Sequence, residues 1–99
     1  MQEIKIAVQQ KHFKEATSFL DNHNCPLAQA LKDAFPDKKI VVWGYDLSIG
    51  NDNYNIPQNW ILAANQRTGV RHLGYFDTLI AKAKAGEEVE TFDLVLTKN

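Results

Sequence analysis

The single cysteine of the chain lies where a helix is expected to begin. Cys25 precedes Pro26, and proline is favoured in the first helical turn because its missing N–H would have no partner there. The free N–H groups and the dipole at a helix start stabilise a thiolate. A thiolate nucleophile also needs a base, which His23 could supply once the chain folds. Cys25 and His23 are therefore the candidate catalytic residues of a cysteine-dependent enzyme.

The same cysteine has a second interpretation, as a small apolar side chain at a crowded helix start. Free cysteine is among the residue types most often buried, and no signature of a cysteine protease surrounds Cys25. The other histidines, His12 and His72, are further candidate bases. None of these residues has the CxxC, HxxxH or HExxH spacing of a metal site, and no glycine-rich phosphate loop occurs. We therefore expect no metal and no cofactor.

Aromatic residues in and beside a predicted hairpin indicate a protein-binding surface. Tyr54 and Trp60 adjoin Asn- and Pro-rich turns, so we expect both to be exposed, whereas Trp43 is expected in the core. The predicted contact surface is the hairpin together with residues 59–69. An unpaired edge strand could also pair with a second copy of the chain and give a homodimer.

Nucleic-acid binding is a weaker alternative, which would use Arg67 and Arg71. Affinity for nucleic acid depends on several phosphate contacts, and the chain has a formal net charge of −1. Glu87, Glu88 and Glu90 would also repel phosphate. We therefore expect a protein partner rather than a nucleic acid.

Composition and length indicate one globular domain over residues 1–99, with 44% hydrophobic and 23% charged residues. No apolar run approaches the roughly 20 residues of a membrane span, so no membrane association is expected. The start of the chain reads as an amphipathic strand and not as a signal peptide. Because one cysteine cannot form an internal disulfide, a reducing compartment is favoured, and the expected location is the cytoplasm.

A mixed series of strands and helices must position these residues. Apolar residues that alternate predict strands, and apolar residues three or four apart predict helices. The expected order is a strand at 4–8, helices at 11–20 and 26–35, strands at 39–49, 54–56 and 59–65, a helix of about 13 residues that ends at Gly86, and a strand at 87–98. This order predicts an α+β fold, in which a small, mostly antiparallel sheet carries two or three helices on one face. The first and last strands are expected to be neighbours or edges.

The segment at 59–65 is the ambiguous one. Its short apolar run fits either a strand or a helix, and the polar residues on both sides favour a strand. The predicted core gathers the apolar residues of the other elements. It comprises Ile4, Ile6, Val8, Phe13, Leu27, Leu31, Phe35, Val42, Phe76, Ile80, Phe92, Leu94 and Leu96.

Short motifs along most of the chain resemble those of small uncharacterised proteins of phages and prophages. They are Cys25-Pro26-Leu27-Ala28-Gln29-Ala30-Leu31, Ile56-Pro57, Phe76-Asp77, Gly86, Val89 and Phe92-Asp93-Leu94. The segment from Trp60 to Gly69 departs from this resemblance as an apparent insertion. The resemblance implies an accessory protein of a mobile element that binds a host or phage protein in the host cytoplasm. It implies no particular activity.

Overall fold

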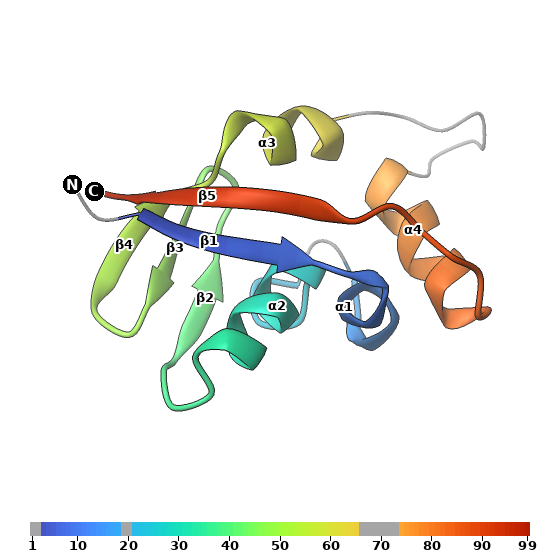
Figure 1. Cartoon of the computed structure of the whole chain (residues 1–99), viewed down its shortest axis with the longest axis horizontal. Helices are drawn as coiled ribbons and strands as arrows, with labels where there is room; N and C mark the ends of the chain where they lie inside the picture. Colours follow the sequence, from blue (N-terminus) through green and yellow to red (C-terminus); the bar gives the residue numbers. More distant parts are fainter. Residues whose placement is uncertain (1–2, 19–20, 66–73) are drawn as a thin grey trace.

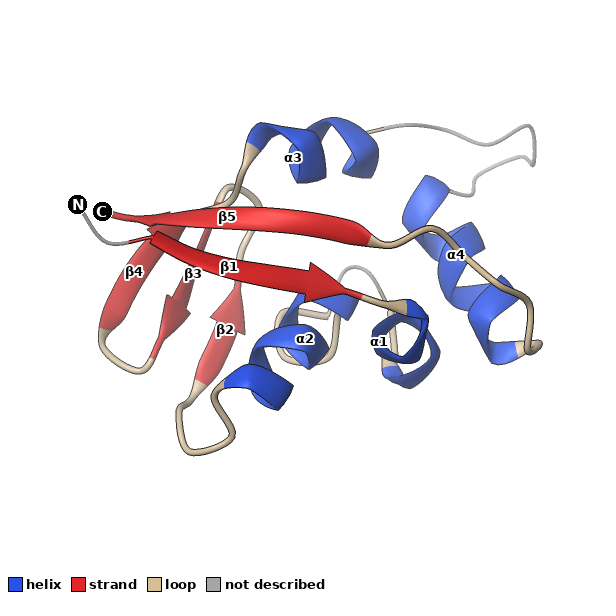
Figure 2. Ribbon diagram, viewed as in Figure 1, coloured by secondary structure: helices blue, strands red, loops and turns tan. Residues whose placement is uncertain are grey.

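An antiparallel, curled sheet forms the frame of this protein (Figure 1). The computed structural model describes residues 3–18, 21–65 and 74–99. Within them, five strands hydrogen-bond in the order β1-β5-β4-β3-β2 and four helices accompany them, which confirms the predicted α+β class (Figure 2). The strands are β1 (Glu3–Val8), β2 (Ile40–Val42), β3 (Asp46–Ile49), β4 (Asp52–Asn55) and β5 (Phe92–Lys98). The helices are α1 (Gln10–Glu15), α2 (Pro26–Ala34), α3 (Gln58–Ala64) and α4 (Tyr75–Lys84).

The first and last strands are neighbours, as expected, and β5 lies between β1 and β4. β1 pairs with β5 along its whole length. Side chains alternate across a strand, so Val8 of β1 is buried on the same inner face as Leu94 and Leu96 of β5. β5 begins at Phe92, later than the predicted start at residue 87.

The helix predicted at 26–35 is confirmed as α2. Pro26 occupies the first turn, and the apolar stripe buries Leu27, Ala30 and Leu31. α2 packs against both edge strands, β1 and β2, which the curl of the sheet brings to the same helix (Figure 1).

Two glycines with positive φ end elements where the sequence predicts it. Gly50, at φ 62°, turns the chain between β3 and β4. Gly86, at φ 85°, follows α4 and donates its N–H to the Ala83 carbonyl, while the Glu87 N–H donates to the Lys82 carbonyl. Together these two hydrogen bonds form a Schellman cap.

The predicted strand at 39–49 is wrong in its middle. The chain turns at Trp43-Gly44-Tyr45, and the two halves pair with each other as β2 and β3. The Trp43 N–H donates to the Asp46 carbonyl at 2.8 Å and closes this hairpin. A glycine in a strand interior has no side chain to pack, which favours a break at Gly44. Trp43, expected in the core, lies on the turn with 46% of its surface exposed.

The predicted strand at 59–65 is also wrong, because this segment forms the helix α3. Trp60 and Ala63, three residues apart, are buried on one face, while Leu62 is 57% exposed. That spacing is helical, but the run is too short to distinguish the two structures without its tertiary contacts. Those contacts are with α4 and β5.

The remaining two helices are shorter than predicted, and of the helix predicted at 11–20, residues 19–20 lie outside the described residues. α1 ends at Glu15, because Ala16 adopts an extended conformation. α4 begins at Tyr75, and Leu73, the predicted start, lies outside the described residues.

Four aromatic rings from four elements meet in the core. They are Phe13 of α1, Trp60 of α3, Phe76 of α4 and Phe92 of β5. The Trp60 ring centroid lies 4.3 Å from that of Phe76 and 5.2 Å from that of Phe92, the latter edge-on. Such geometry adds to the free energy of burial. This ring cluster therefore holds α3 to the rest of the fold.

A buried histidine ties α1 to α2. His12 is 4% exposed, and its Nδ1 accepts a hydrogen bond from the Gln9 N–H at 2.9 Å. The ring proton therefore lies on Nε2, which is 2.9 Å from Oδ2 of Asp33 and donates to it. The hydrogen bonds from His12 and then from Lys11 hold the pKa of Asp33 below its usual value of 3.8.

Truncation of the tryptophan in the ring cluster is expected to lower the stability of the whole fold. Trp60→Ala should reduce the free energy of unfolding by about 3–5 kcal/mol, the range for large-to-small changes of buried aromatics. Urea denaturation measures this. Leu62→Ala, on the exposed face of the same helix, is the matched control and should stay within about 0.5 kcal/mol of wild type. Equal effects of the two changes would contradict the packing described here.

The Asp33 contact predicts an acid-dependent contribution to stability. Because its pKa is lower in the folded chain, the contribution is present above the unfolded value of about 3.8 and is lost as the pH falls towards the folded value. The difference in unfolding free energy between wild type and Asp33→Asn should therefore be constant near neutral pH and shrink below about pH 4. Urea titrations at a series of pH values measure it, with Asp37→Asn as the exposed control. A difference in unfolding free energy that does not change with pH would contradict the lowered pKa of Asp33.

Candidate functional site

The structure reverses the expected exposure of the aromatic residues. Tyr54 and Trp60, predicted to be exposed, are only 5% and 3% exposed. Tyr54 faces inward on β4, a strand that lies between two others, and Trp60 belongs to the ring cluster. The exposed aromatic residues on the β2–β3 turn are instead Trp43, at 46%, and Tyr45, at 74%.

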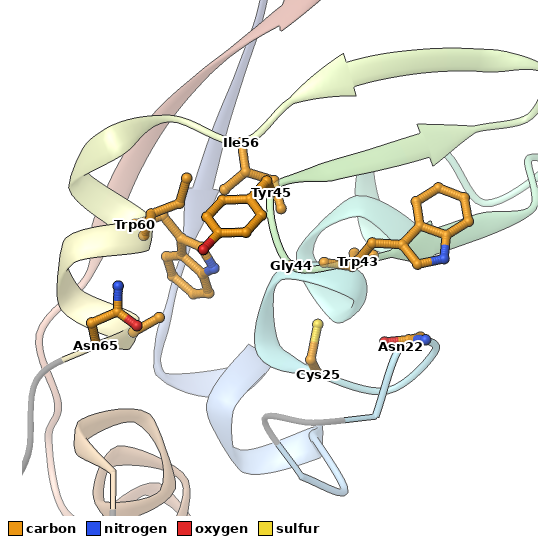
Figure 3. Close-up of a pocket in the computed structure, with 11 residues that line it drawn as sticks. Asn22, Cys25, Trp43, Gly44, Tyr45, Ile56, Trp60 and Asn65 are labelled. Carbon is orange, nitrogen blue, oxygen red and sulfur yellow. The ribbon is translucent and has the colours of Figure 1, made fainter.

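The backbone that carries these two side chains is held by hydrogen bonds on both sides. Besides the Trp43 N–H bond to Asp46, the Tyr45 carbonyl accepts a hydrogen bond from the Ile56 N–H at 3.0 Å. Just before the turn, the Val42 N–H donates to the Asn22 carbonyl at 2.9 Å. The side chains of Trp43 and Tyr45 leave the turn in opposite directions from Gly44 (Figure 3). We call residues 43–45 the aromatic loop.

The candidate functional site is a pocket beside the aromatic loop. It has a volume of about 250 Å³ and lies between this loop, α3 and the turn before α2 (Figure 3). The described residues that line it are Asn22, Cys25, Val42, Trp43, Gly44, Tyr45, Ile56, Trp60, Ile61, Ala64 and Asn65. Of these, Cys25, Val42, Ile56 and Trp60 are buried and form its inner wall.

The pocket is uncharged among its described lining residues. Its polar side-chain groups are the amides of Asn22 and Asn65, the Tyr45 hydroxyl, the indole N–H groups of Trp43 and Trp60, and the Cys25 thiol. Asn22 and Asn65 come from separate segments and are both exposed. In the described part of the chain, no hydrogen bond occupies either amide side chain. The pocket therefore combines apolar and aromatic walls with a few hydrogen-bonding groups, two of them exposed amides, a composition common in ligand sites.

Cys25 lies at the helix start, as predicted, but it is not poised as a nucleophile. It is the N-cap of α2, and its Sγ accepts a hydrogen bond from the Ala28 N–H at 3.3 Å. Burial nevertheless raises the pKa of the thiol above 9.0, because desolvation outweighs the N–H groups of Ala28 and Leu27 that would lower it. Only 2% of the residue is exposed. Burial thus favours the structural interpretation of this cysteine.

The candidate base is not joined to this thiol. His23 is exposed on the turn before α2, where its backbone N–H donates to Oδ1 of Asp21 at 2.9 Å. Among the described residues, no hydrogen bond links His23 to Cys25. Those residues also contain no group of three or more His, Cys, Asp and Glu side chains that could hold a metal ion. Arg67, Arg71 and His72 lie outside the described residues, so their roles stay predictions.

The sequence contains a signal for the aromatic loop that the predicted strand at 39–49 does not take into account. Trp43-Gly44-Tyr45 places a glycine between two large aromatics in the middle of an apolar run. Read as a turn, this triplet exposes both rings; read as a strand, it buries them. The pocket itself could not be predicted, because its wall includes Trp60 and Ala64 of a helix that was predicted as a strand.

No protein-family model, no curated protein and no solved structure matches this chain. In the described part of the chain, no helix combines the length and the apolar character that crossing a membrane requires.

The buried position of Cys25 predicts slow alkylation. In the native protein, iodoacetamide should label the thiol slowly even at pH 8, because burial hinders access and raises the pKa. In urea the same thiol should react at the rate of a free cysteine. Mass spectrometry of timed samples measures both rates. Rapid native labelling with an apparent pKa well below about 8.5 would restore the catalytic hypothesis.

Proposed function

We propose that this protein is a small non-catalytic module that binds another protein through the aromatic loop and the adjacent pocket. The observation that carries the proposal is the exposure of Trp43 (46%) and Tyr45 (74%) on the lining of an uncharged pocket. Tryptophan and tyrosine are enriched in interface hot spots, which cluster around pockets that lose their water on binding. Trp60, proposed from the sequence as a direct contact, supports this surface as part of the pocket wall.

The hydrogen bonds of the aromatic loop support the same proposal. A loop whose backbone is already ordered loses less conformational entropy when a partner binds. The bonds at Trp43 and at the Tyr45 carbonyl order this backbone in the free protein. The free energy gained from contacts of the two rings is therefore offset less by the entropic cost of ordering their backbone.

The competing functions have less support. A thiol-dependent enzyme would need Cys25 accessible and ionised, whereas burial opposes both. An uncharged pocket does not favour phosphate, and so does not favour a nucleic acid. A homodimer through a sheet edge would have to form beside α2, which packs against both edge strands.

The resemblance to phage and prophage proteins adds a context to the proposal. The partner would then be a host or phage protein met in the host cytoplasm. The uncharged lining is consistent with an interface that depends on apolar burial, whose affinity changes little with salt.

Removal of both exposed rings should abolish most of the binding. Peptides from a random display library are selected on the wild-type protein, with counter-selection on Trp43→Ala/Tyr45→Ala. Calorimetric titration of the enriched peptides should show at least about tenfold weaker binding to the double variant, since one hot-spot side chain accounts for about 2 kcal/mol or more. Binding to wild type should stay nearly constant as salt rises.

The control is Val95→Thr on the outer face of β5. It replaces an exposed apolar side chain with a polar one of similar shape. It should bind the selected peptides as wild type does. The proposal fails if no peptide distinguishes wild type from the double variant, or if the control weakens binding equally.

A further inference from the structure

The pocket is larger than a single aromatic ring requires. A cavity of roughly 150 Å³ with apolar walls is sufficient to hold benzene. The pocket here measures about 250 Å³ and is partly open to solvent. Its volume is therefore sufficient for two fused rings, so the choice of occupant depends on the residues of the lining.

The walls favour a flat and uncharged occupant. Trp60 and Tyr45 contribute aromatic rings to the lining, and aromatic groups pack on one another in stacked or edge-on arrangements. No described lining residue carries a charge that could compensate a buried ion, so a charged occupant would lose its hydration without a partner. These walls therefore favour a neutral aromatic group.

The opening has the hydrogen-bonding groups that a peptide requires. The amides of Asn22 and Asn65 each offer both a donor and an acceptor, and they lie on different sides of the pocket (Figure 3). A side chain that carries an N–H and belongs to a peptide can form hydrogen bonds with both amides, through its own N–H and through the peptide groups beside it. The rings of Trp43 and Tyr45 beside the opening would cover the residues that flank it.

From this size, lining and polarity we infer that the pocket binds a neutral fused-ring aromatic group, the indole of a tryptophan on the partner protein. The inference rests on the proposed function and specifies what that function recognises. Tryptophan is the side chain that supplies two fused rings, one N–H and no charge. It is also among the residues most enriched at interface hot spots.

The test titrates the ¹⁵N-labelled protein with small probes and follows its amide signals by NMR. The probes are N-acetyl-tryptophanamide, N-acetyl-phenylalaninamide, N-acetyl-leucinamide and free indole. We expect the tryptophan amide to shift the backbone signals of Gly44 and Tyr45 and the side-chain signals of Asn22 and Asn65. It should bind roughly tenfold more tightly than the leucine amide, since even one methylene in an apolar pocket discriminates by about that factor.

A variant that fills the pocket distinguishes binding inside it from nonspecific binding of the probe elsewhere on the protein surface. Ala64 is a half-buried lining residue on α3, and Ala64→Leu places extra apolar volume in the cavity. The variant should lose the shifts caused by the tryptophan amide. The matched control, Ala81→Leu on the exposed face of α4, should keep them.

Different outcomes distinguish the two proposals. Equal affinity for the tryptophan and leucine amides, or shifts away from the pocket, would overturn the inference. Binding of free indole without binding of N-acetyl-tryptophanamide would contradict a peptide source. If peptides selected through Trp43 and Tyr45 bind Ala64→Leu as tightly as wild type, the proposed function stands and the tryptophan inference fails. Selected peptides that contain tryptophan and lose affinity for Ala64→Leu would support both.

Discussion

One buried side chain, Trp60, connects the core of this structure to the candidate site. Its ring packs on Phe76 and Phe92 and approaches Phe13, so it joins α3 to two other helices and to β5. The same residue lines the pocket beside the aromatic loop. The core and the candidate site therefore share a wall, and the shape of the pocket depends on the packing of the ring cluster.

This shared wall explains which parts of the fold could be predicted from the sequence. Elements whose pattern is local were predicted correctly: α2 follows from the spacing of Leu27, Ala30 and Leu31, and the turns follow from Gly50 and Gly86. α3 could not be predicted, because its seven residues gain their structure from rings far away in the sequence. The break at Gly44 was missed because alternating apolar residues continue on both sides of it.

The reactivity of the candidate site, like the position of α3, depends on tertiary contacts that the local sequence does not reveal. The sequence placed Cys25 correctly at a helix start, and the hydrogen bond from Ala28 to its sulfur confirms that position. Whether such a thiol is reactive depends on how much water reaches it. The spacing of residues near Cys25 in the sequence carries no information about this exposure. Here α2 and the pocket wall remove that water, so burial and the helix N–H groups act on the thiol in opposite directions and burial is the stronger.

The pairing of β1 with β5 has a consequence for how the chain reaches this structure. Glu3 faces Thr97 across the sheet, so the contact joins residues that are far apart in the sequence. During synthesis, the hairpins of β2, β3 and β4 and the helix α2 can form while β1 still lacks its partner. The apolar side chains of β1 then lack their strand partner until β5 has been synthesised. Contacts between distant residues are slow to form, which makes the closure of this strand pair a natural late step in folding.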